Sequence, residues 1–448
     1  MAESQEEKFR RMTEAPVGGL IAKLAVPCII SMLVTSFYNM ADTFFVGQLK
    51  SNAATGAVGV VFSMMAIIQA VGFFFGHGSG NFISRELGKK NSAEAEKMAA
   101  TGFFSALTAG TLIMIAGEIF LEELAYLLGS TETILPYTMD YLRAILLGAP
   151  WITASFVLNN QLRFQGNATY AMVGITCGAV LNIALDPLLI FVMDMGIAGA
   201  GYATVISQFF SFCVLLLGMQ QHGSIKIRVS NLQFKWYYYK NIINGGFPSL
   251  ARQGLASVAT ISLNHAAGPF GDAVIAAMGV VQRITMFGAS AMIGFGQGFQ
   301  PFCGFNFGAG LYKRIKEGFY FCVKTSAVFL LLIAAAGFVF APELISLFRD
   351  DPEVIKIGAL ALRLQCVTFV THSWIVLSNM MTQVIGRAVP ATFLACARQG
   401  LFFIPAVLIL SGAIGVFGIQ LAQPVADICT LICAIPIQLK ILKEFDNK

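Results

Sequence analysis

Two aspartates in otherwise apolar stretches of the sequence have the residue types and spacing to bind a cation or a proton. Asp42 follows Tyr38 by four residues, and Asp186 follows Asn182 by four, so each pair falls on one face of a helix. Pro187 comes next, and because proline lacks an N–H it can leave a backbone carbonyl one turn earlier free for a cation. Carboxylates, an amide and free carbonyls suit a hard cation, so the sequence predicts a hard-cation site at Asp42, Asn182 and Asp186 that could hold Na⁺. The same carboxylates could instead take up a proton.

The elements that carry these aspartates are those of a membrane protein. The chain has 448 residues, of which 56% are hydrophobic and 12% are charged. That is about half the charged fraction of an average soluble protein. A soluble domain with so little charge could not cover its surface, which excludes soluble enzymes, nucleic-acid binders and disordered scaffolds. The apolar runs are long and do not alternate in polarity, so we expect an all-α polytopic membrane protein rather than a β-barrel.

The apolar runs resolve into twelve membrane spans at about 20 residues per crossing. We expect these spans at residues 20–46, 54–82, 98–118, 137–161, 170–193, 196–219, 240–266, 273–301, 319–341, 355–382, 390–411 and 415–441. Within them a charge costs roughly 2.5–3.5 kcal/mol on insertion scales, so a persistent charge usually has a function or a partner. Two simpler interpretations remain open: Asp42 faces water near the outer end of its span, or Asp186 is a locally satisfied helix-end carboxylate.

The basic residues predict the orientation of the chain. One set of alternate connections, together with both termini, holds about 21 of the 29 Lys and Arg residues, and the other set holds about three. By the positive-inside rule, both termini of this multi-pass protein of the cell (inner) membrane face the cytoplasm.

The sequence contains itself twice, in parallel. Shifted by 220 residues, the stretch from about 53 to 171 matches without a gap, and at a shift of 219 Gly196 matches Gly415. Matching pairs include Phe75-Gly76-x-Gly78 with Phe295-Gly296-x-Gly298, Leu142-Arg143 with Leu362-Arg363, Asn159 with Asn379 and Gly166 with Gly386. Each half holds six spans, an even number, so both halves start on the same side. Two parallel six-helix bundles around a central cavity are typical of transporters, and fit a channel or a receptor less well.

The duplication also predicts the domain boundaries. We expect a cytoplasmic N-terminal segment (1–19), an N-lobe with the first six spans (20–219), a cytoplasmic linker (220–239), a C-lobe (240–441) and a cytoplasmic C-terminus (442–448).

The chain carries no sequence signature of a catalyst or an ATPase. GxxxxGK[ST], HExxH and GxSxG are absent, and the four histidines show no metal-ligand spacing. We therefore expect no enzyme activity, no cofactor and no nucleotide partner. An ion gradient would then have to supply the energy for transport.

The second half carries a different set of charges within its spans: Arg252, Arg283, Arg363, Arg398 and Asp427. A pairing of Asp427 with Arg398 or Arg252 would be structural. Four polar residues are expected to line the substrate cavity or to hold its structure: Arg252, Gln253, Arg398 and Asp427. The position that matches Asp186 is Ala406, so we expect the ion site in the first half alone.

A series of motifs in the first half carries a family resemblance. They are Pro27…Asn39-x-x-Asp42-x-x-Phe45-Val46-Gly47, Ile83-Ser84-Arg85-Glu86-Leu87-Gly88-Lys89-Lys90, Arg163-x-x-Gly166-Asn167, Asn182-x-x-x-Asp186-Pro187 and Gly196-x-x-Gly199-Ala200. At these residues the sequence resembles the multidrug and toxic compound extrusion (MATE) family, in particular its bacterial DinF/MepA-like branch. The similarity covers essentially the whole chain, including its duplication.

The resemblance implies a V-shaped pair of six-helix bundles and export of organic cations in exchange for Na⁺ or H⁺. In related members a first-span aspartate, here Asp42, is the coupling residue, and Pro27 would suit a bend of that span. A hydrogen-bonded cluster around the aspartate is matched here by Tyr38, Asn182, Asp186 and Thr204, with Asn159 as a further member.

We therefore expect a secondary active multidrug antiporter that exports amphipathic, mostly cationic compounds, contacts membrane lipids, binds no nucleic acid and functions as a monomer. One alternative is a flippase for lipid-linked saccharides or other amphipathic lipids, in which Arg252, Arg283 and Arg398 would bind a pyrophosphate. Another is a membrane sensor without transport activity, although no appended domain is present to relay a signal.

Overall fold

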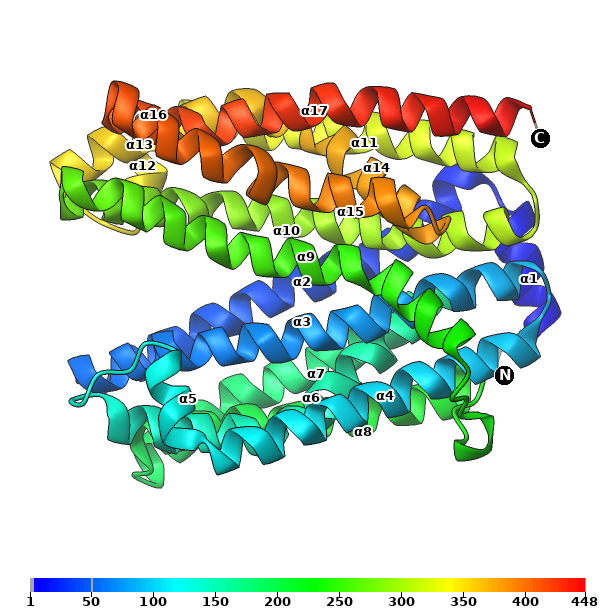
Figure 1. Ribbon diagram of the computed structural model, residues 1–448, viewed down its shortest axis with the longest axis horizontal. Helices are drawn as coiled ribbons and strands as arrows, with labels where there is room; N and C mark the ends of the chain where they lie inside the picture. The colour runs from blue at the N-terminus through cyan, green and yellow to red at the C-terminus, as the bar shows by residue number, and fades with distance from the viewer. Residues whose placement is uncertain (1–3, 50, 448) are drawn as a thin grey trace. The chain divides into compact units, whose positions relative to one another are not determined.

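All twelve predicted spans correspond to helices in a computed structural model of the chain (Figure 1). The structure describes residues 4–49 and 51–447, and the side chains of Asn39, Thr43, Asn52, Ala54 and Thr55 lie outside the description. Ten described helices are long and apolar enough to cross a membrane, and a pair bent by 56° makes an eleventh span. A further long helix, α9 (Trp236–Ala267), covers the predicted span 240–266 but is more polar than these.

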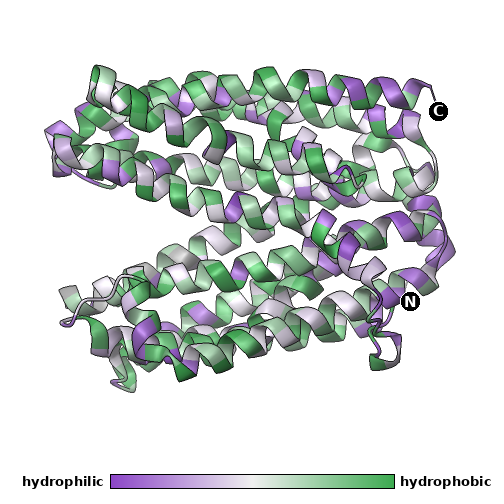
Figure 2. Ribbon diagram, in the orientation of Figure 1, coloured by the Kyte–Doolittle hydropathy of each residue, from purple (hydrophilic) through white to green (hydrophobic). Residues whose placement is uncertain are grey.

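The helices follow the chain in a simple order. They are α1 (Gln5–Glu14), α2 (Val17–Gly47), α3 (Asn52–Gly88), α4 (Ser92–Ile119), α5 (Leu121–Leu127), α6 (Leu135–Phe164), α7 (Ala168–Pro187), η1 (Leu188–Val192), α8 (Gly196–His222), η2 (Val229–Asn231), α9, η3 (Gly268–Phe270), α10 (Asp272–Gly308), α11 (Tyr312–Val339), α12 (Ala341–Ser346), α13 (Pro352–Phe369), α14 (His372–Val384), α15 (Ala388–Cys396), η4 (Ala397–Phe403), α16 (Ile404–Ile414) and α17 (Val416–Asp446). Apolar residues cover most of their length, and hydrophilic residues gather toward helix ends (Figure 2).

Most helices extend beyond the predicted spans. The span predicted at 273–301 is part of α10, which continues to Gly308, and α11 begins at Tyr312 rather than at residue 319. Hydropathy marks only the part of a helix that suits lipid. Polar residues such as Lys313 and Arg314 are good helix formers and continue the helix beyond that part.

The chain forms two compact units. Unit 1 comprises Met1–Glu14 and Ile30–Leu250, and unit 2 comprises Ala15–Ile29 and Ala251–Lys448. Two continuous helices therefore change unit along their length: α2 after Ile29 and α9 after Leu250.

Glycines let the first parts of these two helices pack closely on their neighbours. In unit 1, a Cβ on Gly78 of α3 would lie 2.4 Å from the carbonyl oxygen of Ile242 in α9. In unit 2, a Cβ on Gly298 of α10 would lie 2.4 Å from the Cα atom of Ala25 in α2. Both distances are too short for any side chain, so backbone meets backbone at these crossings. Gly78 and Gly298 are a matched pair of the repeat, which explains the recurrence of the Phe-Gly-x-Gly motif.

The backbone and side-chain contacts of the two units confirm the duplication. Gly166 and Gly386, 220 residues apart, have φ angles of +81° and +80°. Arg143 lies 3.4 Å from the carboxylate of Glu118, and its counterpart Arg363 donates from Nε to the carbonyl oxygen of Phe338 at 3.1 Å. Residues 118 and 338 are also 220 positions apart, so the two arginines reach equivalent positions on α4 and α11.

A short helix before the first span, α1, is fastened to unit 1. Its start is a capping box in which the Ser4 N–H donates to Glu7 Oε2 (2.8 Å) and the Glu7 N–H donates to Ser4 Oγ (3.2 Å). These hydrogen bonds lower the pKa of Glu7. Lys8 is 3% exposed, and its Nζ donates to Asn167 Oδ1 (2.9 Å) and Ser224 Oγ (2.7 Å). The α1 helix is thus hydrogen-bonded to two segments that lie far apart in the sequence, one at Asn167 and one at Ser224.

Candidate functional site

Asp42 lies in the part of α2 that belongs to unit 1. Its side chain is buried, so it does not simply face water. Tyr141 of α6 donates its hydroxyl to Asp42 Oδ2 at 3.4 Å, whereas Asp42 Oδ1 is buried and has no hydrogen-bond partner among the described residues. An unpartnered buried carboxylate oxygen is costly and marks a position at which a ligand would be stabilising.

Asp186 is fully buried at the end of α7. One orientation of the Asn182 amide satisfies both of its polar groups. Its nitrogen then donates to Asp186 Oδ2 at 3.2 Å, and its oxygen accepts the Thr204 backbone N–H of α8 at 3.3 Å. Pro187 follows directly and precedes the π-helical turn η1, so the regular hydrogen-bond ladder of α7 ends beside the carboxylate.

Tyr38 joins the two aspartates. Its hydroxyl lies within hydrogen-bonding reach of Thr204 and Gln208 on α8, and it interacts electrostatically with both Asp42 and Asp186. The two carboxylates also interact with each other. The structure therefore brings five of the six predicted coupling residues into one buried cluster within unit 1.

Asn159, the sixth, has a different contact. Its side-chain nitrogen donates to the carbonyl oxygen of Ala171 at 3.0 Å, and no hydrogen bond between described residues joins it to the aspartates. The same bond recurs in unit 2, where Asn379 donates to Ala391 at 2.7 Å. A bond present in both halves of the repeat fastens neighbouring helices in each.

The cluster offers oxygen ligands and no competing cation. Two carboxylates, two tyrosine hydroxyls and an amide converge, and within the described residues no Lys or Arg contacts them. Such a set suits a hard cation or a proton. No group of three or more His, Cys, Asp or Glu that could hold a metal ion occurs in residues 4–49 or 51–447.

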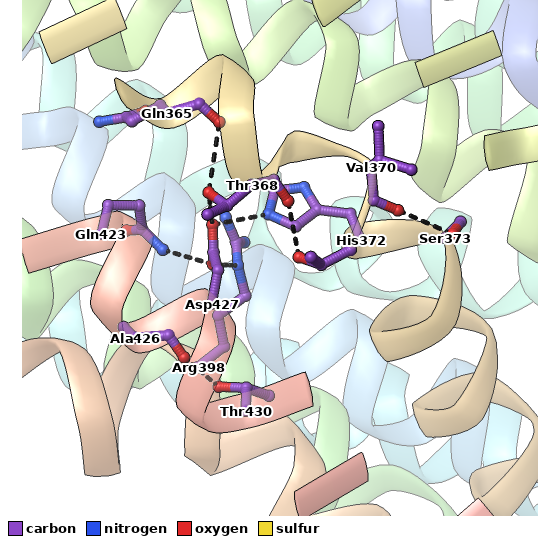
Figure 3. A network of polar contacts seen from close by, with 11 residues as sticks. Gln365, Thr368, Val370, His372, Ser373, Arg398, Gln423, Ala426, Asp427 and Thr430 are labelled. Atoms are coloured by element: carbon purple, nitrogen blue, oxygen red, sulfur yellow. Dashed lines mark hydrogen bonds and ion pairs between the residues drawn. The ribbon is translucent and has the colours of Figure 1, made fainter. Parts of the chain in front are cut away.

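Unit 2 contains a second buried polar network, centred on Asp427 of α17 (Figure 3). Asp427 Oδ1 accepts from Arg398 Nε (2.8 Å) and Gln423 Nε2 (2.9 Å). Oδ2 accepts from Thr368 Oγ1 (3.2 Å) and lies 3.2 Å from His372 Nε2. The expected ion pair of Asp427 is thus formed with Arg398.

The other predicted polar residues of unit 2 lie on α9. Arg252 donates to Asn379 Oδ1 at 3.3 Å and makes no ion pair with the described residues. Gln253 is partly buried, and its carbonyl oxygen accepts from Ser257 Oγ at 3.4 Å.

Sequence reasoning missed five members of the two networks: Tyr141 and Gln208 in unit 1, and Thr368, His372 and Gln423 in unit 2. Gln208 and Tyr141 gave no signal, because their contacts depend on how α6 and α8 pack against α2. His372 was set aside for lack of metal-ligand spacing, yet it contacts Asp427. Gln423 could have been found, because it precedes Asp427 by four residues, the spacing that singled out Asn182 and Asp186.

A sequence profile described as MatE matches residues 27–188 and 248–427. The chain belongs to the MATE family. The two matched segments begin 221 residues apart, as expected for a MATE transporter built by duplication. This transporter is 26% identical over 409 residues to the multidrug export protein MepA of Staphylococcus saprophyticus. The aligned region covers 91% of this chain and 90% of that relative.

Further comparisons agree over nearly the full length of the MATE chain. MepA of Staphylococcus aureus strain NCTC 8325 is 24% identical over 429 residues, which make up 95% of each chain. A MATE protein crystallised in complex with MaL6 superposes with a TM-score of 0.93 at 24% identity and covers 99% of this chain and 100% of its own. A MATE family transporter of the MOP superfamily, solved in an outward-facing conformation, gives a TM-score of 0.92 at 24% identity over 98% of both chains. These structural likenesses show the fold of a multi-pass membrane protein.

Proposed function

We propose that this MATE transporter is a secondary active multidrug antiporter. It exports amphipathic organic compounds, mostly cations, in exchange for H⁺ or Na⁺. The named relatives are multidrug export proteins, which supports the substrate class. The observation that carries the coupling proposal is Asp42 Oδ1, a buried carboxylate oxygen without a partner among the described residues, in a cluster with no Lys or Arg.

The proposed mechanism is competition within one transporter. Asp42 and Asp186 take up the coupling ion when the site is open to the outside, which favours release of the drug. The ion is released on the cytoplasmic side, where both termini lie by the distribution of Lys and Arg. We also propose that the N-lobe and C-lobe, with the boundaries given above, act as the two moving parts of a monomer.

The test is transport by purified protein in liposomes. A fluorescent organic cation is followed under an imposed pH gradient and then under an Na⁺ gradient. We expect movement under one gradient, which identifies the ion, and loss of that movement in Asp42→Asn and Asp186→Asn. Asp140→Asn is a matched control, because Asp140 is an exposed aspartate of α6 next to Tyr141.

Two results would contradict the proposal in different ways. Full gradient-driven export by Asp42→Asn would place coupling elsewhere. No movement of the cation by the wild type under either gradient would refute multidrug antiport, and a lipid-flipping assay would then test the flippase alternative.

A further inference from the structure

The polar networks of the two units lie at equivalent positions of the repeat. At the shift of 219 that aligns α8 with α17, Thr204 corresponds to Gln423 and Gln208 corresponds to Asp427. In unit 1 this helix face contacts Tyr38 beside two aspartates, whereas in unit 2 it contacts Arg398. Duplication has therefore produced two buried networks of opposite charge character.

Asp427 has no capacity left to bind a cation. Its two oxygens are within hydrogen-bonding distance of four side-chain groups, from Arg398, Gln423, Thr368 and His372 (Figure 3). A carboxylate has about four acceptor positions, so these contacts fill them. The carboxylate accordingly holds Arg398 in a fixed orientation. Asp42 differs, because one of its oxygens has no partner within the described part of the chain.

Arg398, in contrast, has donors to spare. Only its Nε is used, by Asp427, and its two terminal nitrogens make no hydrogen bond or ion pair with any described residue. Its side chain is 26% exposed, although Asp427 is almost completely buried. It lies in η4, a π-helical segment in the middle of the span formed by α15, η4 and α16, and such segments often occur at functional sites.

Arg252 is a second cation close to this network. It lies in the middle of α9 and uses one nitrogen to bond Asn379 of α14, the helix that also carries His372. Seven residues of α14 separate Asn379 from His372, which corresponds to about 10 Å along the helix axis. The α9 helix also touches η4, since a Cβ on Gly400 would lie 2.7 Å from Leu255. Arg252 lies just before Leu255 on α9, and Arg398 lies just before Gly400 on η4. Each arginine is therefore less than one helical turn from this contact.

The charges around these two arginines do not cancel. Asp427 neutralises one guanidinium, and every other Asp or Glu in the described part of unit 2 lies within two turns of a helix end. Of these two arginines, Arg252 therefore lacks a counter-ion among the described residues. Such a charge is costly unless a ligand compensates it, and planar guanidinium groups match carboxylates well.

We propose that Arg398 and Arg252 form an anion-binding subsite in unit 2 for the carboxylate of zwitterionic amphipathic substrates. This substrate class rests on the export function proposed above. Asp427 is a positioning residue for Arg398, and Gln423 and Thr368 hold Asp427 in place. With this subsite, the transporter would accept substrates that carry a carboxylate as well as the cations for which unit 1 is suited.

Two dyes that differ in a single group test this proposal. A rhodamine with a free carboxylate is zwitterionic, and its methyl ester is a cation with the same ring system. Fluorescence anisotropy measures the binding of each dye to the purified protein without requiring transport. Arg252→Gln leaves no buried carboxylate unpaired, and the double variant Arg398→Gln/Asp427→Asn removes the ion pair together, so that neither variant leaves an uncompensated buried charge. Arg363→Gln is the control, because this arginine of unit 2 contacts Phe338 instead.

We expect each of the two test variants to bind the acid dye about tenfold or more weakly, the loss typical of one charge-assisted hydrogen bond. Binding of the ester should be unchanged, and Arg363→Gln should bind both dyes like the wild type. Equal losses for acid and ester, or no loss for the acid, would overturn the subsite. A wild type that binds only the ester would also overturn it while leaving cation export intact. Binding of both dyes without gradient-driven movement of either would refute the export function and leave the subsite standing.

Discussion

Replacing Gly298 by alanine tests whether close packing of α2 on α10 holds the first part of α2 in unit 2. The new Cβ would lie 2.4 Å from Ala25 Cα and 2.6 Å from Ala25 N, both backbone atoms, whereas ordinary contact begins at 3.4 Å. The helices must therefore separate by about 1 Å. Gly294, one turn away, is packed equally closely against Ile29, so a local adjustment cannot relieve the clash.

The size of the effect follows from two opposing terms. Overpacking of this kind costs about 1–3 kcal/mol. Alanine gains up to about 1 kcal/mol over glycine in a helix. Gly279→Ala on the same helix isolates the first term, because a Cβ there has nothing within 4 Å and the helical gain is shared. Gly298→Ala should therefore be about 1–3 kcal/mol less stable than Gly279→Ala.

The assay is the apparent melting temperature of each detergent-solubilised variant, read as the loss of monodisperse protein on heating. We expect Gly298→Ala to melt a few degrees below Gly279→Ala. Equal melting temperatures, or a higher one for Gly298→Ala, would show that the close approach of α2 to α10 does not exist in the folded protein.

Two further predictions concern the ends of helices. Lys8→Met should release α1, because it removes two hydrogen bonds of a buried ammonium at a cost of about 2 kcal/mol. Limited trypsin digestion should then cut near Arg10 sooner than in the wild type. An unchanged cleavage rate would contradict this prediction. Gly166→Ala and Gly386→Ala should each lower stability by about 1 kcal/mol, because both residues have φ near +80°, and thermal melts that differ strongly between the two would argue against equivalent turns.

The pattern of hydropathy was sufficient to find the helices but not their full extent. Each of the twelve predicted spans falls on helical segments. A run of about 20 apolar residues is long enough to cross a membrane as a helix, and only 12% of this chain is charged. Predicted ends fell short at α10 and α11, because helix propensity continues past the apolar segment. The passage of α2 and α9 from one unit to the other was not predicted, because it depends on which neighbouring helices each part packs against.

The candidate site was likewise predictable from the sequence only in part. Spacing along one helix identified Asp42 with Tyr38 and Asp186 with Asn182, because residues four apart share a face whatever the fold. Tyr141 and Gln208 reach these groups from other helices, and only packing decides which of their faces meet. Likewise the ion pair of Asp427 had two possible partners in the sequence, and the packing of η4 on α17 selected Arg398.

The sequence by itself determined that this protein is an all-helical membrane protein made of two parallel repeats, because those properties depend on composition and on order along the chain. Tertiary structure decided what each buried charge does. Among the described residues, Asp42 retains an oxygen without a partner, Asp427 contacts four side-chain groups, and Arg398 keeps two nitrogens unused. These differences arise from contacts between helices far apart in the sequence, and the free energy of a charge within a membrane depends on those contacts.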